Sequence, residues 1–218
     1  MEFWNEIAID RSFKVLQELR KEIDFVLIGG WAVYFLTKAI KSKDIDIIVD
    51  FKELTILKMR VGIKKNDLLK RYEGEIEGVS IDIYLPYYSE FAIPPEEILK
   101  NTVRVESFKI PKPEVLLILK QQAEVQRKNS VKGQKDRVDI ICLAKSDKID
   151  WNRYGQLLRK FGVEEYGKRL EEIVRSAGVE FEYLGVKNLR EVRKVKNKIL
   201  REIASWATHG RARAQKMR

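Results

Sequence analysis

The sequence predicts an α/β fold of the α+β kind: a mixed-sheet domain over residues 1–110, followed by a helical domain over residues 111–218. Two observations predict this order. Before Pro111, short apolar runs of strand length alternate with stretches of helical period. After Pro111, apolar residues recur almost throughout at helical spacing. A chain of 218 residues is long enough for one large domain or two small ones with a buried core.

In the first domain, apolar runs and alternating apolar and polar residues predict the strands, and apolar residues three or four apart predict the helices. A proline at the start of a helix loses no hydrogen bond, so Pro94–Pro95 is expected to open a short helix. The predicted strands are 25–28, 44–50, 78–85 and a strand pair within 102–110. The other predicted helices are 2–22, 31–40 and 52–59.

The second domain is predicted to consist of helices only. Residues 209–218 lack apolar periodicity and are expected to fray, so His209, the single histidine, is expected to be neither a base nor a ligand. The predicted helices are 114–127, 136–144, 151–161, 164–176 and 189–206.

Positive charge is concentrated at the C-terminal end. Residues 187–218 contain eleven Lys or Arg and two Glu, a balance of +9, so of the total of +10 only about +1 is left for residues 1–186. A basic stripe can bind a phosphate backbone by releasing counterions. It can equally be the solvated face of a helix. The sequence leaves both interpretations open.

Cysteine usage and hydropathy indicate in which cellular compartment the protein is expected. The single cysteine, Cys142, cannot form an internal disulfide and lies in an apolar run, so we expect it to be buried and inert. The N-terminus has no secretory signal, and no apolar stretch has the length of a membrane span. We therefore expect a cytoplasmic protein without a membrane partner.

Three aspartates interrupt otherwise apolar strands. Residues i and i+2 of a strand point to the same face, so Asp44 and Asp46 project together. Two neighbouring carboxylates repel each other unless a cation lies between them, and oxygen ligands suit magnesium. Asp82 stands in the same way on the strand 78–85. If the two strands are neighbours, three carboxylates converge as two-metal phosphoryl transfer requires.

Gly29 and Gly30 follow the apolar run 25–28. Glycines allow the backbone to turn sharply between a strand and a helix. The first N–H groups of that helix, together with its dipole, favour a bound phosphate.

These residues resemble the nucleotidyltransferases of the DNA polymerase β superfamily: Gly29–Gly30, thirteen residues, Asp44–x–Asp46, and then Asp82. The form Gly–Gly–Trp–Ala–Val is similar to small antibiotic adenylyltransferases and to the nucleotidyltransferases of toxin–antitoxin and abortive-infection systems. A downstream segment with Lys120 and Lys135–Asp136–x–x–Asp139 resembles the helical region of the latter group. The resemblance covers roughly residues 20–145.

The resemblance implies a metal-dependent nucleotidyltransferase that moves a nucleoside monophosphate from a nucleoside triphosphate, usually ATP, to a hydroxyl acceptor. It implies two magnesium ions held by Asp44, Asp46 and Asp82, with Asp82 alternatively taking the acceptor's proton. It also implies a site in a cleft between the two domains. The acceptor could be a protein, a tRNA or other RNA end, or a small molecule. The residues that would bind the triphosphate are Gly29, Gly30, Ser42 and Lys120.

The sequence departs from the family at two places. Gly30 stands where many members have serine, which removes one hydroxyl donor. Many relatives have arginine shortly before the first aspartate; here Ser42 keeps the hydroxyl of that segment, and Lys38, Lys41 or Lys43 would have to replace the arginine.

Structural interpretations remain open for each motif. Lys120 alone could be a surface lysine, and Asp136 a helix cap. The tyrosines after Asp82 could stack on a base or pack a loop; they are Tyr84, Tyr87 and Tyr88. At the level of the whole chain, the alternatives are a catalytically degenerate member that binds nucleotide or RNA, and a nucleic-acid-binding module that uses the basic tail. The oligomeric state is left open.

Overall fold

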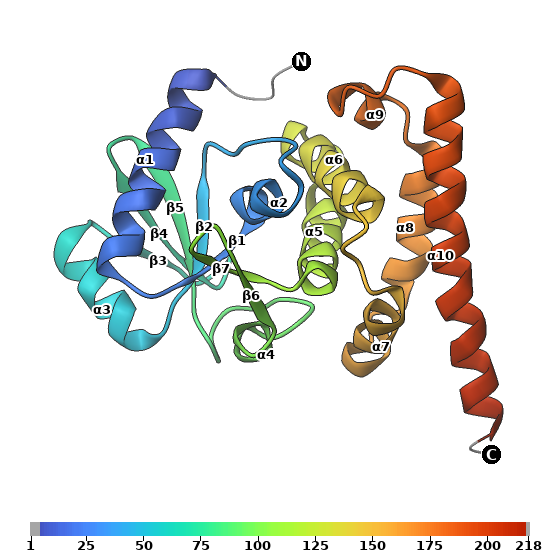
Figure 1. The fold of residues 1–218 in the computed structure, drawn as a ribbon. Helices are drawn as coiled ribbons and strands as arrows, with labels where there is room; N and C mark the ends of the chain where they lie inside the picture. The colour runs from blue at the N-terminus through green and yellow to red at the C-terminus, as the bar shows by residue number, and fades with distance from the viewer. Residues whose placement is uncertain (1–4, 217–218) are drawn as a thin grey trace. The chain divides into compact units, whose positions relative to one another are not determined.

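The computed structural model describes residues 5–216, and their side chains as far as Trp206 (Figure 1). The chain divides into two compact units, Met1–Lys112 and Pro113–Arg218. The first unit holds a mixed sheet with helices, and the second holds helices. Each unit is described by itself below.

The sheet of the first unit has seven strands in the order β3-β4-β5-β2-β1-β7-β6. The pairs β2–β5 and β1–β7 are parallel, and the other neighbouring pairs are antiparallel. The fold class is therefore the mixed-sheet α/β arrangement that the sequence predicted. The strands are β1 (Val26–Ile28), β2 (Ile45–Ile48), β3 (Lys64–Asn66), β4 (Arg71–Ile76), β5 (Val79–Tyr84), β6 (Thr102–Val105) and β7 (Phe108–Pro111).

The hairpin of β3 and β4 is the part of the sheet that the sequence prediction missed. These two strands carry no apolar run: β3 reads Lys–Lys–Asn and β4 reads Arg–Tyr–Glu–Gly–Glu–Ile. They lie at one edge of the sheet, so they need little apolar surface. The turn that joins β4 to β5 lies at Glu77 and Gly78, which both adopt positive φ, 50° and 75°, as a tight hairpin turn demands.

Four helices of the first unit frame this sheet (Figure 1). Helix α2 begins at Gly29, two residues earlier than predicted. Asp50, which the sequence assigned to the end of a strand, instead caps α3, its Oδ1 accepting a hydrogen bond from the Glu53 N–H at 2.9 Å. The helices are α1 (Glu6–Glu22), α2 (Gly29–Thr37), α3 (Phe51–Arg60) and α4 (Pro95–Leu99).

The core of the first unit explains why the carboxylate strands are otherwise apolar. Ile45 and Ile47 on β2 pair with Ile81 and Ile83 on β5, and all four are at most 2% exposed. Beside them, α1 and α2 meet through Trp31, whose indole N–H donates to Ser12 Oγ at 2.9 Å. Burial of these side chains fixes the register of both strands, since a one-residue slip would turn the aspartates into the core.

The first helix of the second unit begins at Pro113. Helix α6 starts at Val131, five residues before the predicted start, because Ser130 caps it through a hydrogen bond from Gly133 N–H at 3.0 Å. The short α9 was not predicted. They are α5 (Pro113–Arg127), α6 (Val131–Lys145), α7 (Trp151–Phe161), α8 (Glu165–Ser176), α9 (Val179–Tyr183) and α10 (Leu189–Lys216).

Helix α10 packs along α7 and α8 through Ile199, Ile203 and Trp206. The Trp206 ring lies over two glycines: a Cβ on Gly155 would come within 2.6 Å of Trp206 Cε3, and one on Gly167 within 2.8 Å of Cζ2. The helix runs on to Lys216, past the predicted end at 206 and through most of the segment expected to fray. The side chains after Trp206, His209 among them, lie outside the described residues.

Two further expectations concern single features. Cys142 is buried and forms no disulfide, as expected. Within the described residues, no helix combines the length and apolarity needed to cross a bilayer.

Candidate active site

The two strands that carry the aspartates are neighbours and run parallel. Their register sets Asp46 directly beside Asp82. Asp44 lies two residues before Asp46, in the bend just ahead of β2. All three side chains are half-buried, whereas the isoleucines between them are buried. The fold thus brings two of the three predicted carboxylates, Asp46 and Asp82, together in register, and Asp44 precedes Asp46 in the chain.

Gly29 contacts this carboxylate group through the start of α2. Its φ is +68°, a conformation that favours glycine, and a Cβ there would lie 2.7 Å from Asp46 Cγ. Both the backbone conformation and the closeness of the Asp46 side chain therefore favour glycine at this position. Gly30 is buried within the first turn. No side chain caps this nine-residue helix, so its first N–H groups remain suited to an anion.

Arg71 is a residue of this region that the sequence analysis did not single out. Its Nη1 pairs with Asp82 Oδ2 at 2.7 Å, and its Nε and Nη2 donate to Glu73 Oε1 at 2.9 and 2.7 Å. Burial acts to lower the pKa of Arg71, but nearby Tyr84, Asp82 and Glu73 outweigh it and raise that pKa. Because β4 pairs with β5, recognising the hairpin in the sequence would have placed Arg71 here.

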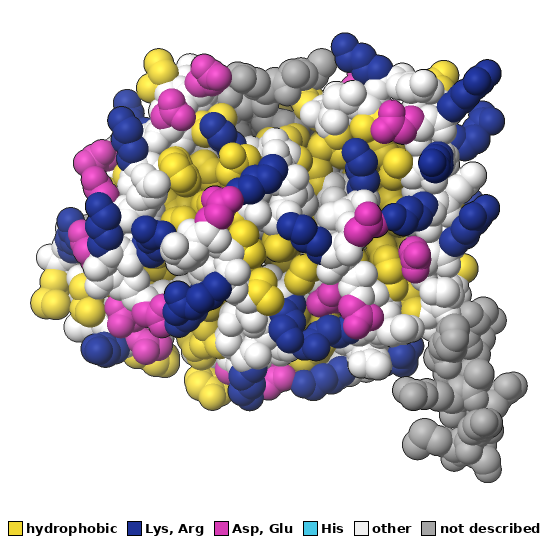
Figure 2. Space-filling model, viewed as in Figure 1, with side chains coloured by type: hydrophobic (Ala, Val, Ile, Leu, Met, Phe, Trp, Pro, Cys, Tyr) yellow, Lys and Arg dark blue, Asp and Glu magenta, His cyan; other side chains and the backbone are white. Residues whose placement is uncertain are grey.

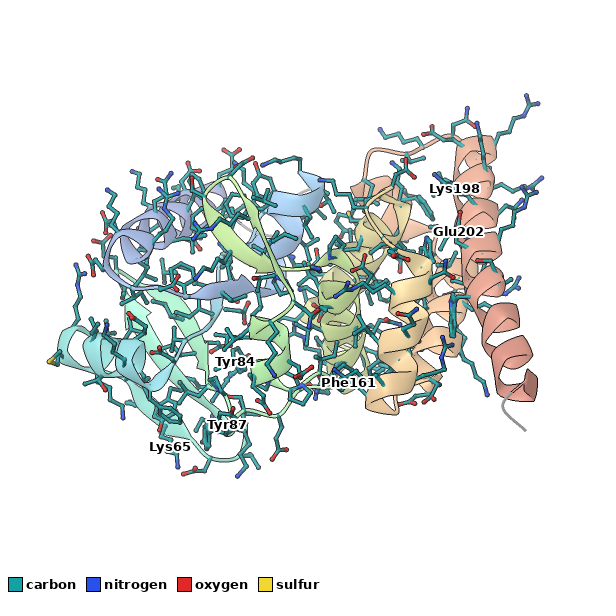
Figure 3. All side chains as sticks on the ribbon, turned by 60° about the horizontal axis from the view of Figure 1, so that its bottom comes forward. Lys65, Tyr84, Tyr87, Phe161, Lys198 and Glu202 are labelled. Atoms are coloured by element: carbon teal, nitrogen blue, oxygen red, sulfur yellow. The ribbon has the colours of Figure 1, made fainter. Side chains whose placement is uncertain are left out.

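The three tyrosines after Asp82 have different environments. Tyr84 is on β5, and its ring contacts the Phe91 ring at a tilt, with 4.7 Å between the ring centroids. Its hydroxyl accepts a hydrogen bond from Arg71 Nη1 at 3.4 Å. Burial, followed by Asp46 and Asp82, raises the pKa of Tyr84. Tyr88 donates to Asp67, and Tyr87 is 84% exposed. Figure 3 shows Tyr84 inside the first unit and Tyr87 nearer its edge. Both Tyr84 and Tyr88 thus serve packing and hydrogen bonding within the unit.

The segment before Asp44 offers few side chains for phosphate in this conformation. Ser42 is 7% exposed. Lys38, in a left-handed conformation with φ 57°, pairs with Glu106 and lies over the Tyr34 ring. Lys41 is exposed and Lys43 half-buried. Of the lysines considered as replacements for the missing arginine, Lys38 is therefore engaged elsewhere.

Lys120 lies in the second unit, on α5, and is 6% exposed. Its Nζ contacts Asp139 Oδ2 at 2.7 Å and Asp136 Oδ1 at 3.0 Å. Arg127 and Lys135 complete the cluster, which we call the α5–α6 ion cluster: Arg127 Nε pairs with Asp136 at 2.7 Å and Lys135 Nζ with Asp139 at 3.0 Å. Lys120 is thus a buried, ion-paired residue and not a surface lysine, while its contact with phosphate stays a prediction. Asp136 lies inside α6, which Ser130 caps, so it is not a helix cap.

Burial and the neighbouring cations shift the pKa of Asp136 in opposite directions. Burial alone would raise the pKa of its carboxyl, but Lys120 and Arg127 lower it below the usual range. Next to this cluster, Glu124, which is also buried, accepts from Arg169 Nε at 2.9 Å. The interior of the second unit therefore compensates its buried carboxylates with lysine and arginine partners.

A metal ion needs oxygen ligands with room to reach it. The carboxylates Asp44, Asp46 and Asp82 are of the chemistry that magnesium prefers, and they are half-buried rather than sealed. Within the described residues, no three acidic, histidine or cysteine side chains are gathered into a ready metal-binding group. The donor set fits the ion, while the position of Arg71 against Asp82 shows that this carboxylate is engaged by a guanidinium in the conformation described.

No family model and no curated protein matches the sequence. Among solved structures, the chain is similar to JHP933 from Helicobacter pylori, with a TM-score of 0.53, 16% identity, and coverage of 98% of this chain and 99% of that one. Weaker likenesses include a putative nucleotidyltransferase from H. pylori, with a TM-score of 0.47, 16% identity, and 99% of both chains covered. Another is ANT(2")-Ia in complex with adenylyl-2"-tobramycin, with a TM-score of 0.46, 15% identity, and 73% and 98% covered.

At these identities the similarity is one of fold. It extends over nearly the whole chain for JHP933. The chain therefore shares the fold of JHP933 over nearly its whole length.

Proposed function

We propose that this protein is a metal-dependent nucleotidyltransferase that moves a nucleoside monophosphate from a nucleoside triphosphate to a hydroxyl acceptor. The observation that carries the proposal is the register of β2 and β5, which aligns Asp46 with Asp82 beside the Gly29–Gly30 start of α2. An acidic side chain on an otherwise buried strand costs free energy unless its charge is paired or coordinates a metal ion. Here the two aspartates lie beside the N-terminus of α2, which no side chain caps.

Each residue has a role in this proposal. Asp44 and Asp46 would hold magnesium, with two ions in all, and Asp82 would either complete that site or accept the proton of the attacking hydroxyl. Bound magnesium would neutralise charge on the triphosphate and orient the reacting groups. The α2 N–H groups at Gly29 and Gly30 would hold a phosphate, and Ser42 and Lys120 remain candidates for further phosphate contacts.

ATP as the donor rests on the motif resemblance. The same resemblance supports a place among the toxin–antitoxin or abortive-infection enzymes. The proposed acceptor is a hydroxyl of a protein, of a tRNA or other RNA end, or of a small molecule.

A second candidate function is nucleotide binding without transfer. The observation that favours it is the Arg71–Asp82 ion pair at 2.7 Å, because a carboxylate engaged by a guanidinium is not free to take a proton or a metal ion. Under this alternative, Asp44 and Asp46 still bind the metal–nucleotide complex, and no covalent product forms.

The experiment that tests both functions is incubation of the purified protein with α-³²P-labelled ATP, magnesium and cell extract. Transfer attaches the labelled monophosphate to a protein, an RNA or a small molecule, which separation by size and nuclease treatment distinguishes. Asp46→Asn serves as the inactive control and Asp50→Asn as the matched one, since Asp50 caps α3.

Labelling by the wild type and by Asp50→Asn, but not by Asp46→Asn, supports transfer. Magnesium-dependent ATP binding without any labelled product supports the second function. If none of the four common nucleoside triphosphates binds and no labelled product forms, both proposed functions are contradicted.

A further inference from the structure

The solvent face of α10 carries basic side chains that no acidic residue neutralises. Four of them form what we call the α10 basic ridge: Arg190, Arg193, Lys194 and Arg201, all exposed. Within the described part of the chain, none of the four makes an ion pair. Figure 2 shows Lys and Arg side chains standing out over this helix. The ridge is therefore a locally uncompensated positive surface.

Helix geometry places the ridge opposite the buried face. At 3.6 residues per turn, the four residues fall within an arc of about 100° and extend over about 17 Å of helix. Ile199, Ile203 and Trp206 lie on the other side, where they are 1–9% exposed. The flank between the two faces carries Lys198 and Glu202, both labelled in Figure 3, and Lys198 pairs with Asp147. Docking of the apolar side thus holds the ridge outward.

Another helix of the same unit shows what a solvated charged face looks like here. On α8, Arg169 pairs with Glu172 at 3.0 Å and Arg175 with Glu171 at 2.6 Å, each within one turn. Two of its three basic side chains are thus neutralised along the helix itself, and Lys168 is the exception. The two acidic residues of α10 between 189 and 206, Glu191 and Glu202, lie off the arc of the ridge. A helix face that is merely solvated does not require its basic residues to be separated from its acidic ones in this way.

We propose that the α10 basic ridge binds the phosphodiester backbone of a nucleic acid. A duplex carries one negative charge per about 1.7 Å of its axis, so a segment as long as the ridge offers more phosphates than the ridge has cations. Three of the four residues are arginine, whose planar guanidinium matches phosphate oxygens in pairs. Recognition of this kind reads charge and spacing and does not select a base sequence.

An anionic membrane is the other polyanion that a basic helix can meet. Helices that lie in a membrane interface bury large apolar side chains beneath their charged face. On α10, Ile199, Ile203 and Trp206 are instead buried in the second unit, Leu200 is half-buried, and between 189 and 206 the one large apolar side chain that is exposed is Leu189. The ridge therefore fits a phosphodiester backbone better than a lipid surface.

The test compares two variants of the full chain with equal net charge. The ridge variant is R190Q/R193Q/K194Q/R201Q. The control variant is K14Q/K21Q/K52Q/K128Q, which removes four exposed lysines of α1, α3 and the α5–α6 turn. Each variant lowers the net charge from +10 to +6. Fluorescence anisotropy with labelled single-stranded RNA, single-stranded DNA and duplex DNA is measured over a range of salt, without nucleotide or magnesium.

The wild type should bind with a steep salt dependence, and the ridge variant should lose roughly tenfold or more in affinity and up to about 2.8 in the salt slope on single strands. The control variant should stay within about twofold of the wild type, because its charges lie elsewhere. Tighter binding of RNA than DNA identifies an RNA ligand, and equal binding identifies the backbone alone.

Three results would overturn the proposal: no salt-dependent binding by the wild type, equal losses in both variants, or tighter binding to phosphatidylserine vesicles than to any nucleic acid. Circular dichroism and thermal unfolding of both variants show that the fold is kept. Because the assay contains no donor and no metal, its failure leaves the proposed transfer reaction untouched.

Discussion

The carboxylates of the first unit and those of the second are set in opposite surroundings. In the α5–α6 ion cluster, Asp136 and Asp139 are at most 1% exposed and contact lysine and arginine at 2.7–3.1 Å. On β2 and β5, Asp46 and Asp82 are half-buried, and Asp82 pairs with Arg71, which Glu73 shares.

The difference shows how one residue type serves two purposes. A fully buried carboxylate has to be compensated inside the protein, and its partners then become part of the fold. A half-buried carboxylate at the edge of solvent can exchange its partner for a cation from outside. Each substitution below changes either the half-buried carboxylates of the first unit or the α5–α6 ion cluster of the second.

The largest effect is expected from the double change Asp44→Asn and Asp46→Asn. Magnesium binding and nucleotidyl transfer should fall below detection, because the amides keep the shape but lose the charge that the ion needs. The fold should remain, since neither side chain belongs to the core. Calorimetric titration with magnesium, alongside thermal unfolding, measures both; undiminished metal binding would remove these residues from the site.

Asp82→Asn should reduce the rate of transfer by ~10²–10⁴, which is the usual contribution of a general base. Nucleotide binding should weaken much less, because the base acts on the acceptor. Single-turnover rates and nucleotide dissociation constants separate the two. A rate near that of the wild type would make Asp82 a structural residue paired with Arg71.

Lys120→Met should destabilise the protein by about 3–5 kcal/mol, because it leaves Asp136 and Asp139 buried with fewer cations. Urea unfolding measures this loss. The effect on nucleotide affinity then decides the second role of Lys120. A stable variant with weakened nucleotide binding would show that Lys120 acts on phosphate rather than in the α5–α6 ion cluster.

The pH dependence of unfolding should carry the signature of Asp136. Its folded-state pKa is lower than the usual 3.8, so its stabilising contribution is complete above that value and is lost as the pH falls from 3.8 through the folded-state pKa. The difference in unfolding free energy between wild type and Asp136→Asn should shrink over this acidic window. A difference that does not change with pH would contradict the ion pairing.

The smallest effect is expected from Arg71→Gln. A partly exposed ion pair contributes only about 0.2–1 kcal/mol, so the melting temperature should change little. Magnesium should bind more tightly, because no guanidinium competes for Asp82. Glu73→Gln is the matched control, since it changes the other partner of Arg71. Weaker magnesium binding in Arg71→Gln would mean that Arg71 organises the carboxylates rather than opposing the metal.

The sequence predicted the parts of the fold in which burial leaves a pattern. The strands with Ile45, Ile47, Ile81 and Ile83, and the helices after Pro113, follow from apolar spacing. The hairpin of β3 and β4 could not be found in this way, because an edge hairpin of charged residues has no apolar period. Arg71 was missed with it.

For the candidate site, the local motifs were enough to bring Asp44, Asp46 and Asp82 into consideration. Their pairing partners depend on contacts between residues distant in sequence, such as Arg71 with Asp82 or Lys120 with Asp139. Such contacts follow from tertiary packing, and spacing along the chain does not encode them. The assignment of these residues to metal and phosphate stays a prediction.

The two glycines beneath the Trp206 ring, Gly155 and Gly167, affect more than local packing. Because they have no side chain, they leave room for the Trp206 ring, which helps to set which side of α10 faces the second unit along a helix about 40 Å long. An alanine at either glycine would place its Cβ within 2.6–2.8 Å of the Trp206 ring, so the ring or the helix that carries it would have to shift. The direction in which its arginines point thus depends on residues that no comparison of charged positions would ever flag.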